Sequence, residues 1–430
     1  MAGKTPLHEF QTRPVVPRGE MRPIFPAARK SDSRPVRRRG YPYRPRLGTH
    51  TVRRIALVEE VPELTTILSY ALPQDKETSS RTLETWYNER TKGGFSLNVE
   101  AYPLRLEPLL VERPWGGTLL TQIFSEAPRR GNGKNPVGEA WVLSDHPSHA
   151  SRIVSGPLAG RTLREFVRDF PHAAFGACAS PGPDGRFPLL VKFIEAAADL
   201  SVQVHPDDAY ALEHEGDLGK SEAWYFLRTN TAGTVIAGHR FPDRETYFRA
   251  VREGQVRDYL LTASVRPKTF LYIPAGTVHI LLADTVVVEI QEASDVTYRI
   301  YDWDRIDPAT GKARELHVEK AADVLRFEAA GTVPDVREGD VDTPYFFATR
   351  FALPRGERLS LVPAARRCPL VLIGVEGEAD VEAEGAPVER ELLREGTTVL
   401  LPATLEETTV FARKDTEFLL VEPKTPTRGA

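Results

Sequence analysis

The chain has 430 residues, 41% of them hydrophobic, and a formal net charge of -4 at pH 7. That length allows two or three domains with buried cores, and the near-neutral charge argues against nucleic acid as the main partner. The sequence contains no stretch of about 20 apolar residues that could cross a membrane. It also lacks the apolar segment near the start that a secretion signal would have. We therefore expect a cytoplasmic protein, in which Cys178 and Cys368 could form one disulfide without needing it.

The first part of the chain differs from the rest in composition. Residues 1–54 contain 14 Lys or Arg, only three acids, many prolines and no apolar period. Such a composition cannot bury a core, so we expect a disordered basic extension and linker over residues 1–96, with at most a short helix at 55–72. An Arg-rich, acid-poor arm could bind nucleic acid or act as a transit peptide, but we favour a dispensable tail.

From residue 102 onward, short β-branched runs stand between Gly, Pro and Asp residues, for example at 270–273, 285–290 and 398–401. Runs of this kind predict strands of an antiparallel barrel or sandwich. The fold is therefore predicted to be mainly β.

Helices are expected between these strands. Thr162 and Glu165 form a capping box that predicts a helix ending before Pro171. Apolar spacing predicts two more helices, over about 243–261 and 315–327.

One weak internal repeat divides this region. Residues 270–275 and 398–403 both read as a strand that runs into a Pro-containing turn. We infer two related barrels, one over residues 97–330 and a smaller one over 331–430. No histidine follows His317, so only the first barrel can build a histidine-based metal site, and the second is predicted to be metal-free.

Three segments of the first barrel carry candidate metal ligands. In a strand, residues two apart point to the same face, which pairs Gln203 with His205, and Lys220 with Glu222. In the third segment, Pro and Gly set a tight turn that directs His279 back toward the interior.

Gln203, His205, Glu222 and His279 together form a nitrogen and oxygen ligand set. Imidazoles and a carboxylate suit Zn²⁺ and other first-row ions. One such histidine alone would more often be a core or surface residue, so the prediction depends on the combination. The other histidines that we considered, His214, His239 and His317, lack such contexts and are expected to be solvated.

These segments resemble the type I phosphomannose isomerase family, particularly its short bacterial form, over about residues 102–423. The resemblance implies two cupin (jelly-roll) barrels with inserted helices and one zinc ion per chain, held by Gln203, His205, Glu222 and His279. One departure is that residues 266–269 stand where the family often has a Gly-Asp turn. The matching motifs are Pro114–Gly117, Gly138–Trp141, Gln203–Pro206, Gly219–Glu222, Pro274–His279 and Gln291–Arg299.

The resemblance also places the family's catalytic residues on Arg299, Lys220 and Asp295. Arg299 is expected to stabilise an enediolate or orient the sugar, with a phosphate clamp as the alternative. Lys220, if desolvated beside a metal, should have a lowered pKa suited to proton transfer, or else be a static counter-charge. Asp295 either relays a proton or, as we favour slightly, fixes Arg299 by a salt bridge.

Trp115, Glu139 and Trp141 match family motifs, but barrel packing is the simpler role for them.

The predicted activity is the metal-dependent interconversion of mannose 6-phosphate and fructose 6-phosphate through an enediolate. Alternatives are an isomerase of an unphosphorylated sugar and a non-catalytic, sugar-binding cupin. A cupin dioxygenase would more naturally carry histidine where Gln203 stands. The expected partners are the two sugar phosphates, without nucleic acid or membrane, and the expected state is a monomer or weak homo-oligomer.

A deletion tests the interpretation of the basic extension. A variant lacking residues 1–95 should fold and isomerise mannose 6-phosphate at the rate of the full chain, because the removed composition cannot contribute a core. Turnover and melting temperature of both proteins check this, and a large drop in either would show that the extension packs on the barrels.

Overall fold

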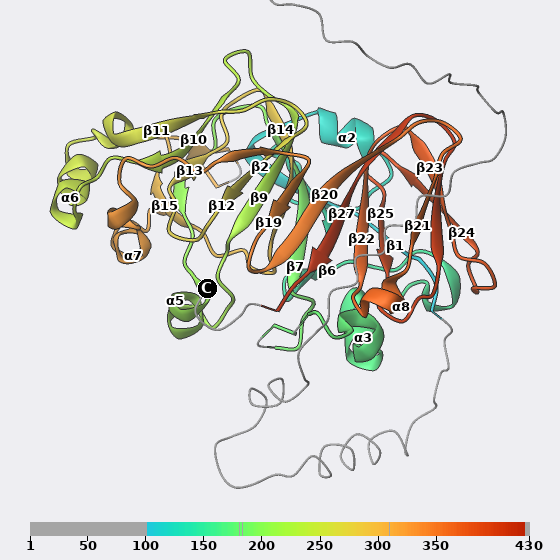
Figure 1. Ribbon diagram of the computed structural model, residues 1–430. Coiled ribbons are helices and arrows are strands. Elements are labelled where there is room, and N and C mark those ends of the chain that lie inside the picture. Colours follow the sequence, from blue (N-terminus) through green and yellow to red (C-terminus); the bar gives the residue numbers. More distant parts are fainter. Residues whose placement is uncertain (1–100, 180, 183, 309, 426–430) are drawn as a thin grey trace, which may run out of the picture. The chain divides into compact units, whose positions relative to one another are not determined.

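The computed structural model describes residues 101–425, except 180, 183 and 309 (Figure 1). The expected disordered extension and the short helix at 55–72 lie outside these residues. Within the described part, no helix is both long and apolar enough to span a bilayer.

The first half of the described chain is built on two facing sheets (Figure 1). Their shared core contains Trp224 and Val287 from one sheet and Val204 and Ile280 from the other. The eight-stranded sheet has the order β18 (Val336–Glu338), β12 (Thr269–Ile273), β9 (Glu222–Arg228), β14 (Thr285–Glu292), β7 (Leu189–Ala196), β4 (Val137–Leu143), β2 (Leu109–Gly117) and β3 (Arg129–Arg130). The five-stranded sheet has the order β11 (Leu260–Ser264), β10 (Thr234–His239), β13 (His279–Ile280), β8 (Val202–Val204) and β15 (Tyr298–Tyr301).

The second half is also a pair of sheets, which enclose a core that includes Leu372, Val381 and Val410. The six-stranded sheet has the order β1 (Leu104–Leu106), β25 (Thr398–Leu401), β22 (Leu370–Glu376), β27 (Thr416–Pro423), β20 (Phe346–Leu353) and β19 (Asp340–Asp342). The four-stranded sheet has the order β21 (Arg358–Leu361), β26 (Thr408–Ala412), β23 (Glu378–Glu382) and β24 (Arg390–Arg394).

The eight-stranded and six-stranded sheets share a further core. Val288 and Ile290 of β14 belong to the same hydrophobic cluster as Val371 of β22 and Leu419 of β27. Strands β7 and β14 are consequently buried along their whole length. Because both faces of these strands are covered, consecutive apolar residues occur in each, as in Leu189–Val191 and Val286–Val288.

The helices lie outside the sheets. Helix α3 (Leu163–Asp169) begins at Thr162 with the predicted capping box and ends before Pro171. The predicted helix at 243–261 is too long: α6 (Arg244–Arg252) stops near Gly254, whose φ is +68°, and residues 260–264 form β11. The third predicted helix is α7 (Val318–Val324).

The remaining short elements connect the sheets. They are α2 (Leu119–Ile123), α4 (Pro171–Phe175), α5 (Asp208–His214), α8 (Pro363–Arg366), 3₁₀ turns at Gly156–Leu158, Val256–Tyr259 and Phe327–Ala329, and the strand pairs β5 (Asp145–His146) with β6 (His149–Ala150) and β16 (Ile306–Asp307) with β17 (Lys312–Ala313).

The domain limits at residues 97–330 and 331–430 stay a prediction. Two strands pair across them, since β1 joins β25 and β18 joins β12, both antiparallel.

The loop at 266–269, where the sequence analysis noted a departure from the resembling family, makes a salt bridge between the two halves. Lys268 adopts a left-handed φ of +69°, which glycine would take without strain. Its Nζ lies 2.8 Å from Glu417 Oε2, and the carboxylate of Glu417 also accepts from Tyr225 and Arg350. Burial raises the pKa of Glu417, but these three donors outweigh it and lower that pKa to about 2.

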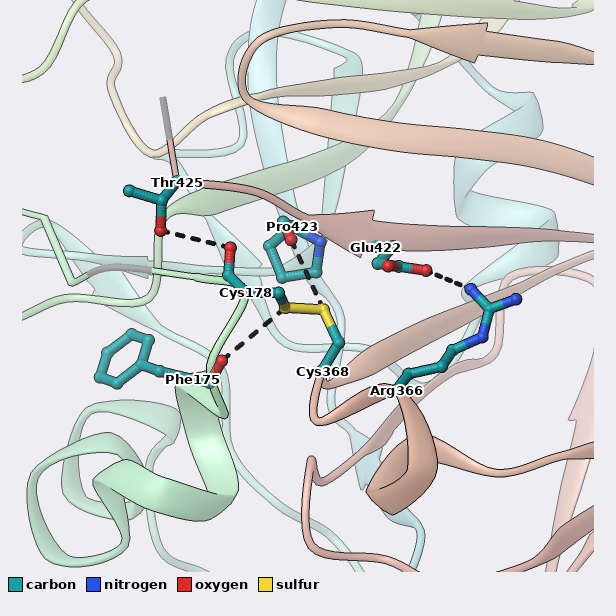
Figure 2. Close-up of a disulfide and its surroundings, with 7 residues drawn as sticks. All are labelled: Phe175, Cys178, Arg366, Cys368, Glu422, Pro423 and Thr425. Carbon is teal, nitrogen blue, oxygen red and sulfur yellow. Dashed lines mark hydrogen bonds and ion pairs between the residues drawn. A yellow bond between two sulfur atoms is a disulfide. The ribbon is translucent and has the colours of Figure 1, made fainter. Parts of the chain in front are cut away.

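A disulfide makes a second link. Cys178, after α4, bonds to Cys368, before β22, and the two Cα atoms are 5.4 Å apart. Figure 2 shows the end of the described chain beside it, where Thr425 Oγ1 donates to the carbonyl oxygen of Cys178 at 3.2 Å. The bridge closes a loop with a sequence separation of 190.

Reduction tests the contribution of this bridge. Opening so long a loop should destabilise the protein by up to about 5 kcal/mol in the chain-entropy model, which corresponds to a fall in Tm of about 5 °C. Calorimetry of the wild type with and without reductant measures it. A Cys178→Ser, Cys368→Ser double variant is the control, because its Tm should not respond to reductant. A wild-type Tm that stays constant after full reduction, verified by thiol titration, would contradict the prediction.

Candidate active site and metal centre

The candidate site lies between the five-stranded and eight-stranded sheets. Gln203 is the middle residue of β8, and its register partners are His279 on β13 and Arg299 on β15. His205 follows β8 directly. Glu222 opens β9 in the other sheet. The strand order therefore collects residues that are 96 positions apart in sequence, as the span from Gln203 to Arg299 shows.

The four predicted ligands converge in space. His279 Nε2 lies 3.1 Å from His205 Nε2 and 3.2 Å from Gln203 Nε2. The carboxylate of Glu222 lies 3.5 Å from His205 Nε2 and 3.4 Å from His279 Nε2. Ligands bound at 2.0–2.1 Å to a tetrahedral ion would stand about 3.3 Å apart, so the spacings among His205, Glu222 and His279 match those of a metal centre. Gln203 presents its amide nitrogen to His279 and would bind an ion with its oxygen turned inward.

The surroundings of these side chains support the same conclusion. Glu222 and His279 are fully buried and His205 is 1% exposed. Neither oxygen of Glu222 accepts a well-aligned hydrogen bond from the described residues. The His279 Nδ1 lies 2.9 Å from the carbonyl oxygen of Thr277, which leaves Nε2 as the ligand atom. The donor set fits a first-row divalent ion.

Burial also sets the protonation of the imidazoles. It lowers the pKa of His205 well below its usual value and that of His279 to about 4. Both rings are therefore neutral at pH 7, the form that binds a metal.

Lys220 stands beside the ligands as predicted. Its Nζ lies 3.2 Å from Glu222 Oε2 and 3.1 Å from His205 Nε2. The lowering of its pKa that is expected beside a bound metal stays a prediction, and the protein's own groups act in the opposite direction. Burial lowers the pKa of Lys220, but Glu222, Glu289 and Asp295 raise it by more, so the ammonium form is favoured.

A cavity of about 390 Å³, large enough for a sugar phosphate, lies beside the ligand cluster. It brings together Gln203 and the three predicted catalytic residues Lys220, Asp295 and Arg299. Its other lining residues are Glu112, Arg113, Pro114, Trp115, Asn135, Glu139, Lys192, Ile194, Leu200, Ser201, Glu289, Thr297, Asp307 and Arg314.

The favoured salt bridge between Asp295 and Arg299 is not formed. Asp295 instead pairs with Lys192, at 3.6 Å between Oδ1 and Nζ. Burial raises the pKa of Asp295, but Lys192, Arg113 and Lys220 lower it by more, so the group is an anion. Asp295 thus balances the lysines at the cavity wall.

The segment after the small β16–β17 pair holds Arg299 in place. Arg299 Nη1 donates to the carbonyl oxygen of Glu315 at 2.8 Å. The backbone N–H of Arg299 donates to His317 Nδ1 at 3.2 Å, and its carbonyl accepts from His317 N at 2.7 Å. Burial and the neighbouring Arg314 lower the pKa of Arg299 to about 10, which leaves it protonated at pH 7.

The sequence analysis did not single out two buried charges of the eight-stranded sheet. Lys192 on β7 and Glu289 on β14 are register partners, and their charged atoms lie 3.5 Å apart. Lys192 Nζ stands 5.1 Å above the ring of Trp141, and Glu289 Oε2 accepts from Trp224 Nε1 at 3.0 Å. A charge within an otherwise apolar strand is costly to bury. The charged residue inside each of these apolar runs was therefore the sequence signal that could have identified Lys192 and Glu289.

Packing is only part of the role of Trp115 and Glu139, because both also line the cavity. Glu139 forms a two-bond ion pair with Arg113, at 2.7 and 2.9 Å.

Of the three histidines predicted to be solvated, only His214 is. His214 is exposed, but His317 is half-buried and His239 is 2% exposed.

Comparisons with known proteins identify the relatives of this chain. Residues 104–226 match the family model described as phosphomannose isomerase type I, catalytic domain. The mannose-6-phosphate isomerase ManA of Bacillus subtilis is 33% identical over 313 residues, which are 71% of this chain and 94% of the relative. The mannose-6-phosphate isomerase of Streptococcus mutans is 33% identical over 311 residues, again 71% and 94%.

Solved structures show the same relationship. The crystal structure of mannose 6-phosphate isomerase from Bacillus subtilis has a TM-score of 0.64 at 30% identity, and the match covers 74% of this chain and 99% of that one. A putative mannosephosphate isomerase from Archaeoglobus fulgidus, at 21% identity and a TM-score of 0.60, shares the fold, with 76% and 100% covered. The predicted mainly β, cupin fold is thereby confirmed. With a catalytic-domain match and relatives aligned over nearly their whole length, the chain belongs to the type I phosphomannose isomerase family.

Proposed function

We propose that this protein is a metal-dependent aldose–ketose isomerase that interconverts mannose 6-phosphate and fructose 6-phosphate through an enediolate. The observation that carries the proposal is the buried cluster of His205, Glu222 and His279. Lys220 contacts this cluster and lines the adjacent cavity together with Gln203 and Arg299. The named activity of the Bacillus and Streptococcus relatives supports the choice of substrate. A direct assay is to supply purified protein and Zn²⁺ with mannose 6-phosphate and measure fructose 6-phosphate, with free mannose in parallel.

We propose Zn²⁺ as the native metal, with one ion per chain held by Gln203, His205, Glu222 and His279. A related isomerase of this fold, 17% identical, has been solved with zinc bound, and the imidazole and carboxylate donors suit that ion. When bound, a divalent ion acts as a Lewis acid toward the sugar oxygens near C1 and C2.

The chain's own residues have to manage a proton and a negative charge. Isomerisation transfers a proton between C1 and C2 and develops charge on the adjacent oxygens. Lys220, as an ammonium beside the ligands, can donate a hydrogen bond to one of these oxygens. Arg299 is the register neighbour of Gln203, so its guanidinium can stabilise the same charge. Since the expected salt bridge from Asp295 to Arg299 is not formed, we propose that Asp295 supports the site through its ion pair with Lys192.

Charge pairing favours a phosphorylated sugar over the alternative of an unphosphorylated one. Each of the other basic side chains of the cavity has a carboxylate partner within ion-pair distance, whereas none of the described carboxylates comes that near to Arg299. A cation without a counter-ion in a half-buried position suits an anionic ligand. The other alternative, a non-catalytic sugar-binding cupin, would not need the buried Lys220.

The localisation, oligomeric state and partners of the enzyme stay predictions. It is a cytoplasmic monomer or weak homo-oligomer with no nucleic-acid or membrane partner. Size-exclusion chromatography with light scattering tests the oligomeric state.

Metal removal gives the first test of the site. A His205→Ala, His279→Ala double variant should lose its bound metal and its isomerase activity, because two of the four proposed ligands are removed. Elemental analysis and the mannose 6-phosphate assay measure both effects. His214→Ala is the matched control, since this histidine is exposed and should leave both unchanged. Stoichiometric metal in the double variant would refute the ligand assignment.

Arg299→Ala gives the second test. If Arg299 stabilises the developing charge, kcat and kcat/KM should both fall, by about 10²–10³. If it clamps only the phosphate, KM should rise while kcat stays near the wild-type value. Arg299→Lys should restore activity only in part, because lysine keeps the charge but loses the planar fork. A wild-type kcat at saturating mannose 6-phosphate would exclude the catalytic role.

A further inference from the structure

The segments that carry the proposed ligands are tied to one another through their backbones. Gly276 N, in the turn before His279, donates to the carbonyl oxygen of His205 at 2.8 Å. Lys220 N donates to the carbonyl oxygen of Pro206 at 3.0 Å. A shift of any one of these segments is therefore transmitted to the others.

Two carboxyl groups hold the segment that leads into β9. Asp208, the first residue of α5, accepts from Gly219 N at 2.9 Å through Oδ1. Glu292, the last residue of β14, accepts from Ser221 N at 2.7 Å through Oε1, and its own backbone N–H donates to the carbonyl oxygen of Ser221 at 3.2 Å. The two N–H groups that these acids bind flank Lys220 in the sequence.

The carboxyl group of Glu292 is buried against a second acid. Its side chain is hydrogen-bonded to that of Asp208, and Glu292 is 3% exposed. Two carboxyl groups can hydrogen-bond to each other only when one of them carries a proton. Burial raises the pKa of Glu292 well above its usual value, and the charge of Asp208 raises it further, against the opposing effect of the Ser221 N–H. Glu292 is therefore the member of the pair that holds the proton.

Two tyrosines complete the titratable surroundings of Glu292 in the described part of the chain. Tyr272 of β12 and Tyr345, just before β20, both interact electrostatically with it. Burial raises the pKa of Tyr272 to about 12 and raises that of Tyr345 further. Both rings are neutral around pH 7, so the charge of this cluster is decided by the pair Asp208 and Glu292.

We propose that Asp208 and Glu292 share one proton and, as a hydrogen-bonded carboxyl pair, position Lys220 and Glu222 for catalysis. The role in catalysis rests on the proposed function, whereas the shared proton does not. Neither acid of the pair lines the cavity, so both act by positioning. Without Glu292, the buried N–H of Ser221 loses its acceptor. The segment can then shift, and it carries the proposed ligand Glu222 and the ammonium of Lys220 with it.

Glu292→Ala tests the positioning role. It should lower kcat for mannose 6-phosphate about 10- to 100-fold and weaken Zn²⁺ binding by a similar factor, as is usual when a group that supports a metal ligand is lost. KM should change little, because the cavity wall is untouched. Steady-state kinetics and competition with a chelator measure these effects.

Glu292→Gln is the conservative variant and should retain most of the activity and of the Zn²⁺ affinity. Its amide oxygen can still accept from Ser221 N, and its amide nitrogen can still donate to Asp208. Glu213→Gln is the matched control, because it makes the same change at an exposed position of α5 and should equal the wild type. If Glu292→Ala does not fold, Glu292→Asp withdraws the carboxyl group by one methylene and should show a smaller loss of the same kind.

The shared proton has a test that needs no substrate. Above the usual pKa of a glutamate, the folded wild type holds a proton that the unfolded chain has released, so its stability falls as the pH rises toward the raised pKa of Glu292. Glu292→Gln carries no such proton. In urea titrations between about pH 5 and 8, the unfolding equilibrium constant of the wild type should rise by up to about 10-fold more per pH unit than that of the variant.

The possible outcomes separate the levels of the proposal. Equal pH dependence of unfolding in the wild type and in Glu292→Gln overturns the shared proton. A folded Glu292→Ala variant with wild-type kcat and Zn²⁺ affinity overturns the positioning role, even if its Tm is lower. A Glu292→Gln variant as impaired as Glu292→Ala overturns the hydrogen-bonding basis of that role. A wild type that does not convert mannose 6-phosphate overturns the proposed function, and the pH dependence of unfolding still decides whether the pair shares a proton.

Discussion

The carboxylate of Glu222 is fully buried between two sheets, and the arrangement around it compensates for its charge. An isolated carboxylate in such a place would be strongly destabilising. Two neutral imidazoles and the ammonium of Lys220 stand within 3.5 Å of it, and the spacing of the donors leaves room for a cation at their centre. The local structure is organised by this requirement, because strands β8, β9 and β13 must each deliver a side chain to one point.

The eight-stranded sheet makes that delivery possible because it is covered on both faces. On one face, alternate residues of β7 and β14 pack against the six-stranded sheet, which gives the site a rigid support. On the other face, Lys192 and Glu289 are register partners beside the ligands. The second half of the chain, which contributes none of the ligands or proposed catalytic residues, thus fixes the positions of those that do.

The mainly β fold and the grouping of the four proposed ligands could be predicted from the sequence, because both depend on local patterns. The i,i+2 spacing of Gln203 and His205, and the Pro-Gly turn before His279, are local patterns, and local geometry determines where those side chains point. The mainly β fold followed from runs such as 285–290. Asp295 was assigned to the wrong partner, because pairing with Lys192 depends on the approach of β7, which no local pattern encodes. The same holds for Arg314 and His317, whose contacts with the Arg299 region appear only after residues 302–315 have returned to β15.

The disulfide between Cys178 and Cys368 has a topological consequence. All four ligands, both lysines of the cavity wall, and Arg299 and Arg314 lie between the two cysteines, so the chemistry is carried by a covalently closed ring. The exposed strands β16 and β17 belong to that ring. A protease that cut the chain there would leave a nicked protein whose two fragments stay joined through sulfur. The fragments would migrate as one species on a non-reducing gel and separate only after a thiol is added.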